Sequence, residues 1–169
     1  MKKFTLNLKI CLTLTMCLLF MGVSKFKLLD EQTDYIQQLL VGHYNEELET
    51  SQIKHYELNV TNSGFCRYKR FFKSGKIEYF SFNLMKFKDL DYQGTDTTGA
   101  LFLYTRGDDV IVQTYNDTNE EDVDTMANYM SIPVKNIKTQ DLTALSEQIR
   151  KTNAPLLAQK YCKTHFPQT

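Results

Sequence analysis

The feature that most constrains the fold is a stretch of chain, residues 53 to 116, that has the character of several β-strands in a row. It contains no proline and thirteen aromatic side chains, arranged in alternating runs that break at glycine or at short polar clusters. Such runs favour β-strands, and short connections between them force hairpins. The pattern therefore predicts an antiparallel meander with strands at residues 53–61, 65–73, 76–88, 99–106 and 109–115, and a polar loop at 91–98.

Helical patterns flank this meander. Residues 30–41 predict a short N-terminal helix, with apolar side chains at near-helical spacing. After the meander, residues 120–131 fit a helix and a strand equally well, and residues 132–137 predict a short edge strand, where proline is tolerated. A further helix is expected from Thr139, and Pro155 is expected to break it before a last short helix.

These elements indicate the fold class. We expect one mainly β domain of the α+β type over residues 25–169, with an N-terminal helix and C-terminal helices. The strands are expected to form a strongly curved antiparallel meander or a small barrel of about six strands. About 145 residues are enough to bury a hydrophobic core of their own.

Residues 1–24 have the composition of a secretory signal peptide. Three lysines form a positive start, an apolar run follows over residues 10–23, and small residues stand near Ser24. We therefore expect an extracytoplasmic protein, periplasmic or secreted, cleaved near Ser24. Two alternatives stay open: an uncleaved anchor, for which the run is shorter than the roughly 20 residues of a spanning helix, and lipidation at Cys17.

Charge excludes one large class of partner. The whole chain has 20 basic and 20 acidic residues, and residues 1–24 hold three of the lysines and no acid, so cleavage leaves a net charge of −3. Sequence-independent nucleic-acid binding needs clustered cations. No apolar run after residue 24 is long enough to span a bilayer. We therefore expect no nucleic-acid partner and no stable membrane span after cleavage.

Two cysteines remain after the signal segment, Cys66 and Cys162. In an oxidising compartment such a pair favours one disulfide, because free thiols outside the cell tend to oxidise. The bridge would tie the C-terminal helix to the second strand. The alternative is two unpaired thiols, one buried in a strand and one near the C-terminus.

A candidate ligand site lies on the hairpin of the second and third strands. A two-residue turn at Ser74-Gly75 predicts that side chains of both strands share one face of the sheet. The ligand-binding residues expected on this face are Tyr68, Arg70, Tyr79, Ser81 and Asn83. Aromatic walls with a few polar groups are typical of a small-molecule site, and a guanidinium can clamp a carboxylate or phosphate. The alternative is an ordinary exposed face, and a register shifted by one residue would remove the basis of the site.

Signals of common enzyme chemistry are missing from the sequence. The histidines His43, His55 and His165 have no metal-ligand spacing. No phosphate loop, dinucleotide fingerprint or nucleophile elbow occurs, and the acidic stretch 117–124 lacks the central glycine of a calcium loop. We expect no enzyme activity, no cofactor and no metal, although a catalytic site assembled only by folding would leave no such signal.

The order of elements resembles that of a lipocalin. That family opens its first strand with Gly-x-Trp and has eight strands in its barrel. Here Gly42-His43-Tyr44 follows the first helix, with tyrosine in the tryptophan position, and about six strands are expected. The resemblance covers residues 28 to about 160 in the order of elements, and it implies a carrier of a small, partly apolar molecule.

The sequence leaves two functions. The first is non-enzymatic binding of a small, partly apolar or anionic ligand on the concave face of the sheet. The alternative is recognition of a protein partner by an exported inhibitor or immunity-type protein, through an exposed aromatic or acidic surface. A lined cavity of at least roughly 300 Å³ would favour the first, and a filled interior with a flat apolar patch would favour the second.

Overall fold

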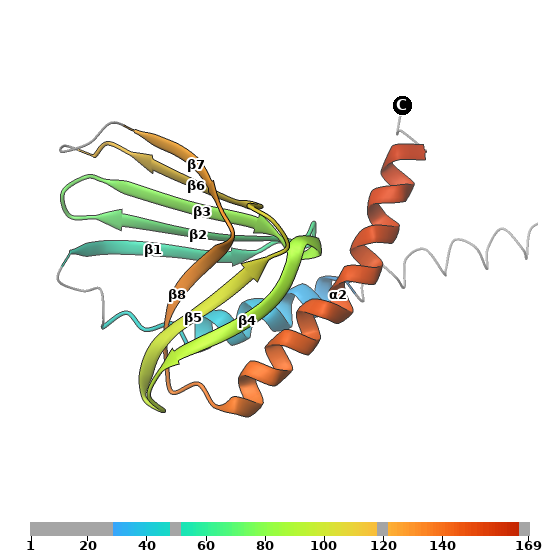
Figure 1. The fold of residues 1–169 in the computed structure, drawn as a ribbon, viewed down its shortest axis with the longest axis horizontal. Helices are drawn as coiled ribbons and strands as arrows, with labels where there is room; N and C mark the ends of the chain where they lie inside the picture. The colour runs from blue at the N-terminus through green and yellow to red at the C-terminus, as the bar shows by residue number, and fades with distance from the viewer. Residues whose placement is uncertain (1–28, 48–51, 118–121, 166–169) are drawn as a thin grey trace, which may run out of the picture.

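The computed structural model describes residues 29–47, 52–117 and 122–165, apart from the side chains of residues 123 and 158–165. The predicted signal peptide and Cys17 lie outside the described residues. The chain has an α+β fold: an N-terminal helix, described over residues 29–42, is followed by two antiparallel sheets and a C-terminal helix (Figure 1).

The described strands form a five-stranded and a three-stranded sheet. The first has the order β1-β2-β3-β6-β7, and in the second β5 lies between β4 and β8. The strand bounds are β1 Ile53–Val60, β2 Phe65–Phe72, β3 Ile77–Asn83, β4 Phe87–Gly94, β5 Thr98–Thr105, β6 Val110–Tyr115, β7 Val123–Ala127 and β8 Tyr129–Lys135. A 3-10 helix, η1, spans Leu84–Lys86, and the C-terminal helix α2 spans Thr139–His165.

Strands that continue from one sheet into the other join the two sheets. β3 leads through η1 into β4, β7 leads through Asn128 into β8, and a short turn joins β5 to β6. The pairing register of β3 continues to the start of β4: Ser81 pairs with Ile111, and Phe87, six residues further on, pairs with Thr105, six residues back. It then shifts at a bulge between Phe87 and Asp89. The amide of Thr105 also donates to the carbonyl of Asn128 at 2.8 Å. The fold is therefore one antiparallel meander with a sharp bend.

Both sheets and both helices contribute to the hydrophobic core. Behind the N-terminal helix, Tyr44 forms an isolated bridge with Val134, stacks on Tyr56 at 3.8 Å, and shares a hydrogen bond of 2.8 Å with the hydroxyl of Tyr68. The largest fully buried side chains are Tyr68, Phe82, Phe87, Ile36, Leu40, Leu84, Leu101, Leu103, Met130, Ile132, Leu145 and Ile149. Each apolar side chain of this size contributes about 1.5–3 kcal/mol by leaving water.

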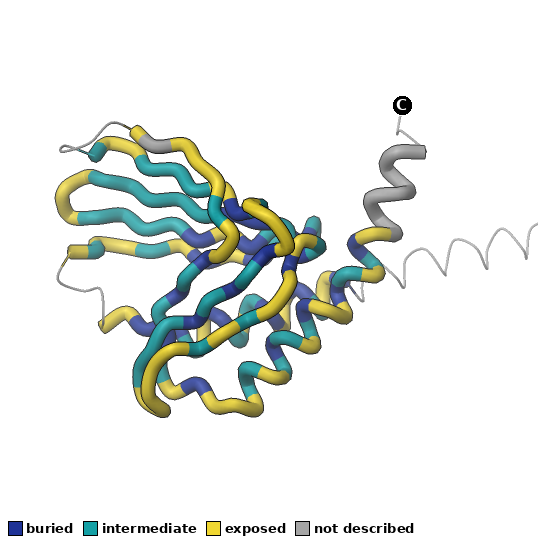
Figure 2. Tube along the Cα trace, viewed as in Figure 1, coloured by how far each residue is buried: buried dark blue, intermediate teal, exposed yellow. Residues whose placement is uncertain are grey.

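The five-stranded sheet is covered at one end only. The side chains of Cys66, Phe82 and Val110 are buried at the end where the strands meet η1. At the other end Ile77 is half-buried and Tyr115 is 39% exposed. Figure 2 shows this change as dark blue near η1 and teal and yellow toward the free end of the sheet.

The antiparallel α+β fold is confirmed, but the strand count and one loop were wrong. Eight strands are described instead of six, because the expected strand at 76–88 divides at η1 and because the undecided segment before residue 129 contains a further strand, β7. The expected loop at 91–98 instead holds most of β4. Its outward side chains are polar because β4 is an edge strand with one face toward solvent. The described strands form two open sheets, and no closed barrel is found among them.

One undecided segment and one expected helix break lie near the C-terminus. Residues 123–127 are strand β7, because each of them pairs with a residue of β6. The expected break at Pro155 is wrong, since α2 runs through it as one helix. Thr152 and Leu156, on either side of the proline, are buried in the core. This packing outweighs the lost hydrogen bond and the steric clash that a proline brings to a helix.

Candidate interaction site

The turn between β2 and β3 determines whether the predicted ligand site exists. The amide of Phe72 donates to the carbonyl of Lys76 at 2.9 Å, and the amide of Gly75 donates back to Phe72 at 3.1 Å. Gly75 has a φ of 96°, the left-handed conformation that closes a three-residue hairpin loop. The loop is therefore 73–75, and the predicted two-residue turn was wrong.

One extra loop residue changes which side chains share a face. Tyr68 now pairs with Phe80 and Arg70 with Glu78, on the face that contributes to the core. Tyr79 and Ser81 lie on the opposite face, because side chains alternate along a strand. Asn83 also leaves the predicted group, since its side chain accepts a hydrogen bond from the first turn of η1. The five residues expected on one face are divided between two, so the premise of the site was wrong.

Arg70 is paired within the protein. Its guanidinium forms an ion pair with Glu78, and it lies 5.5 Å from the ring centroid of Phe80. Lys76 extends this network, with its ammonium 3.1 Å from Glu78 and 3.0 Å from Asp117. Hydrogen bonds to Asp117 and Glu78 raise the pKa of Lys76. The shifted register places Glu78 directly opposite Arg70, on the same face of the sheet.

Cys66 is fully buried in β2, and within the described residues its sulfur forms no disulfide. Burial raises its pKa to about 12, because the thiolate would lose its hydration there. The side chain of Cys162 lies outside the described residues. The disulfide between the two cysteines therefore stays a prediction.

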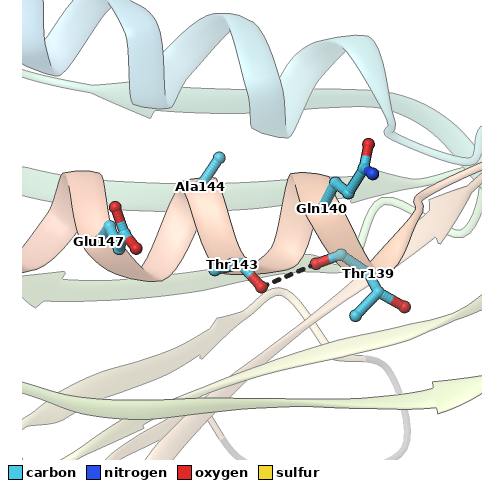
Figure 3. Close-up of a pocket in the computed structure, with 5 residues that line it drawn as sticks. All are labelled: Thr139, Gln140, Thr143, Ala144 and Glu147. Carbon is cyan, nitrogen blue, oxygen red and sulfur yellow. Dashed lines mark hydrogen bonds between the residues drawn. The ribbon is translucent and has the colours of Figure 1, made fainter.

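A hollow of about 340 Å³ runs along the first turns of α2 (Figure 3). Its described lining comes from one helix only: Thr139, Gln140, Thr143, Ala144 and Glu147. The hydroxyl of Thr143 donates to the carbonyl of Thr139 at 2.9 Å, so this polar group is already used within the helix. The hollow is open to the surface, whereas typical small-molecule sites enclose the ligand among convergent polar groups.

Three aromatic side chains gather on the outer face of the three-stranded sheet. The ring centroids of Phe102 and Tyr104 lie 5.6 and 5.7 Å from that of Tyr129. Leu101 and Leu103, which alternate with the first two in β5, are buried in the core. The rings therefore point away from the core, and Tyr129 is 43% exposed. We call Phe102, Tyr104 and Tyr129 the aromatic patch.

Two carboxylates border the aromatic patch. In the β4–β5 pairing, Asp89 stands opposite Tyr104 and Asp91 opposite Phe102, so all four lie on the same face. Both aspartates are exposed. Arg150 of α2 approaches Asp89 at 3.3 Å across the edge of the sheet, with both side chains more than half exposed. The aromatic patch is therefore bordered by two exposed carboxylates, of which Asp89 is ion-paired with Arg150.

The described residues offer few other centres of chemistry. Within the described ranges, no three His, Cys, Asp or Glu side chains lie close enough together to hold a metal ion. No helix in the described part of the chain combines the length and the apolar character that crossing a membrane requires.

Comparison of the chain with family models, with curated proteins and with solved structures gave no match. Any function assigned to the candidate site therefore has to be argued from the geometry of the site. Sequence reasoning missed the aromatic patch, although one signal was present. In the predicted strand 99–106, leucines alternate with Phe102 and Tyr104, so both faces of the strand are apolar. A strand at the surface with two apolar faces indicates either a second layer or a contact surface.

Proposed function

We propose that this protein is a non-enzymatic binding domain that recognises a basic surface of a protein partner through the aromatic patch. The observation that carries the proposal is the cluster of Phe102, Tyr104 and Tyr129 facing away from a filled core. This is the second of the two functions left open by the sequence. The expected export to an extracytoplasmic compartment belongs to the same proposal.

The chemistry of the patch favours a cationic partner. Aromatic faces attract guanidinium and ammonium groups, and Asp89 and Asp91 stand opposite Tyr104 and Phe102 on the neighbouring strand. Tyrosine and phenylalanine are rigid and amphipathic, and such residues dominate the energetics of protein interfaces. An arginine of the partner can therefore stack on a ring and pair with an aspartate at the same time.

Small-ligand binding, which the lipocalin resemblance implies, has less support. Its predicted residues lie on two faces of the sheet, and Arg70 is engaged by Glu78. The hollow along α2 is large enough for a small molecule but lies on one helix and is open to solvent. These features do not combine aromatic walls with an available anion-binding group.

The proposal is tested by affinity capture from an extract of the producing cells and their medium. The bait is the full chain, compared with a variant in which Phe102, Tyr104 and Tyr129 are all replaced by alanine. We expect a protein that the wild type retains, that salt elutes, and that the variant retains at least tenfold less, because several stacking contacts are lost together.

Tyr35→Ala is the matched control, since Tyr35 is 44% exposed on the N-terminal helix and lies outside the patch. This control should retain the partner as the wild type does. The proposal is wrong if the triple variant, still folded by circular dichroism, retains the same proteins as the wild type. It is also wrong if native mass spectrometry of the purified protein shows a bound small molecule and no protein.

A further inference from the structure

Three of the four outer strands of the two sheets have their free edges blocked by side chains or by another segment. On β1, the side-chain amide of Gln37 donates to the carbonyl of Leu58 at 2.8 Å and accepts from the amide of Val60. On β8, the amide of Asn45 donates to the carbonyl of Pro133 at 3.0 Å. Blocking the free edge of a strand is how proteins prevent uncontrolled pairing with other chains.

The third blocked edge is that of β4, where the guanidinium of Arg150 lies 3.0 Å from the carbonyl of Lys88. The fourth edge, that of β7, differs. For β7, the main-chain pairing seen within the described part of the chain is with β6 alone. Every second residue of an antiparallel strand directs its N–H and C=O away from its partner. As far as the described residues show, β7 therefore presents unpaired donors and acceptors along an open edge.

This edge adjoins the aromatic patch. β7 passes through the single residue Asn128 into β8, which begins with Tyr129. Met126, on β7, is 49% exposed. One end of a strand added to β7 would thus lie near Tyr129. The side chains of the added strand would contact both β7 and the aromatic patch.

We propose that the partner docks by strand addition: an extended basic segment pairs with β7 and places cationic side chains against its acidic groups. This inference rests on the proposed function and names how the same partner is held. Asp124 lies exposed on β7, and Asp122 stands exposed just before the strand. These charges attract an arginine-rich or lysine-rich segment, and they disfavour self-pairing, because a second copy would bring like charges onto adjacent strands.

The test uses a seven-residue peptide that alternates arginine and valine, with the full chain labelled for NMR. Two further peptides are N-methylated at the odd or at the even positions, which removes half of the peptide's N–H donors without changing its charge. Only every second peptide N–H faces β7 in a paired strand. We expect one methylated peptide to bind at least tenfold more weakly than the parent and the other to bind about equally.

Amide hydrogen exchange locates the contact. Bound parent peptide should slow exchange of alternate amides within residues 123–127 by at least tenfold, with no comparable change in β1. Asp124→Lys should weaken binding of the peptide. Asp96→Lys, at an exposed turn beyond β4, is the control and should leave the binding unchanged. Equal binding of both methylated peptides, or protection confined to another strand, would overturn strand addition.

These outcomes are separate from those of the capture experiment. If the triple patch variant loses the captured protein while the peptides show no position dependence, the proposed function holds and strand addition fails. If the peptides behave as expected while the triple variant keeps the captured protein, β7 is a docking edge and the aromatic patch is not the recognition surface.

Discussion

The two sheets are both antiparallel but bury their side chains in different ways. In the three-stranded sheet, burial alternates along each strand: Leu101 and Leu103 are in the core, and Phe102 and Tyr104 face outward. In the five-stranded sheet, burial changes along the length of the strands, from the fully buried Cys66 at one end to half-exposed residues at the other. The first sheet therefore separates buried from outward-facing side chains by face, and the second separates them by position along the strands.

The largest expected effect tests the separation by face. Ile132 is fully buried on β8, and its neighbour Ser131 points to the outer face. Ile132→Ala should lower the free energy of unfolding by about 2–5 kcal/mol, because it leaves a cavity in the core. Ser131→Ala should change it by less than about 0.5 kcal/mol. Urea denaturation of the two variants measures both, and similar losses would break the distinction between the faces.

Two glycines test whether one end of the five-stranded sheet is covered and the other end is not. Gly64 and Gly75 both have positive φ angles, 81° and 96°, so alanine is strained at either site. At Gly64 the added Cβ would also lie 2.5 Å from Cδ1 of the buried Leu156, whereas nothing lies within 4 Å at Gly75.

Gly64→Ala should therefore cost about 1–3 kcal/mol more than Gly75→Ala, the usual cost of overpacking a core. Thermal and chemical unfolding of both variants measure this difference, and Leu156→Ala combined with Gly64→Ala should reduce it. Equal losses from the two alanine substitutions would mean that α2 does not cover the end of the sheet at Gly64.

The smallest effect concerns the uncovered end, where Lys76 pairs with Glu78 and Asp117. Because these hydrogen bonds raise its pKa in the folded chain, the stabilisation is complete at pH values below the ordinary pKa of lysine. It is lost as the pH rises through the raised pKa.

We expect Lys76→Met to cost at most about 1 kcal/mol at neutral pH, the scale of a partly exposed ion pair. The difference from wild type should disappear in strongly alkaline solution. Lys54→Met, on the exposed side of β1, is the control and should show no such dependence. Unfolding curves over an alkaline pH series decide this, and a pH-independent difference would contradict the ion-pair account.

The strand positions could be predicted from the sequence wherever the pattern was local. Strands β1, β2, β5 and β6 lie within about one residue of their predicted bounds, because aromatic alternation and glycine turns determine them directly. The edge strand β4 was missed because Asp91 and Gln93 are polar. In an edge strand with one solvated face, polar residues at alternate positions are compatible with pairing.

The candidate site could not be predicted, because it depends on one residue of register. Whether Lys73 belongs to the β2–β3 loop is decided by the left-handed conformation of Gly75, and both loop lengths fit the letters of the sequence. A shift of one residue moves every partner to the other face. The aromatic patch required a second piece of information, the pairing of Tyr104 with Tyr129 on β8, which tertiary structure alone provides.

The central claim is that the outer face of the three-stranded sheet meets a protein partner and the outer face of the five-stranded sheet does not. Site-specific photocross-linking in the producing cells compares the two faces directly, with p-benzoylphenylalanine placed at Tyr104 in one strain and at Tyr79 in the other. Both tyrosines are half-buried in central strands. The account predicts a cross-linked product to another protein from position 104 and none from position 79. Cross-links of equal yield from both positions, or from position 79 alone, would contradict it.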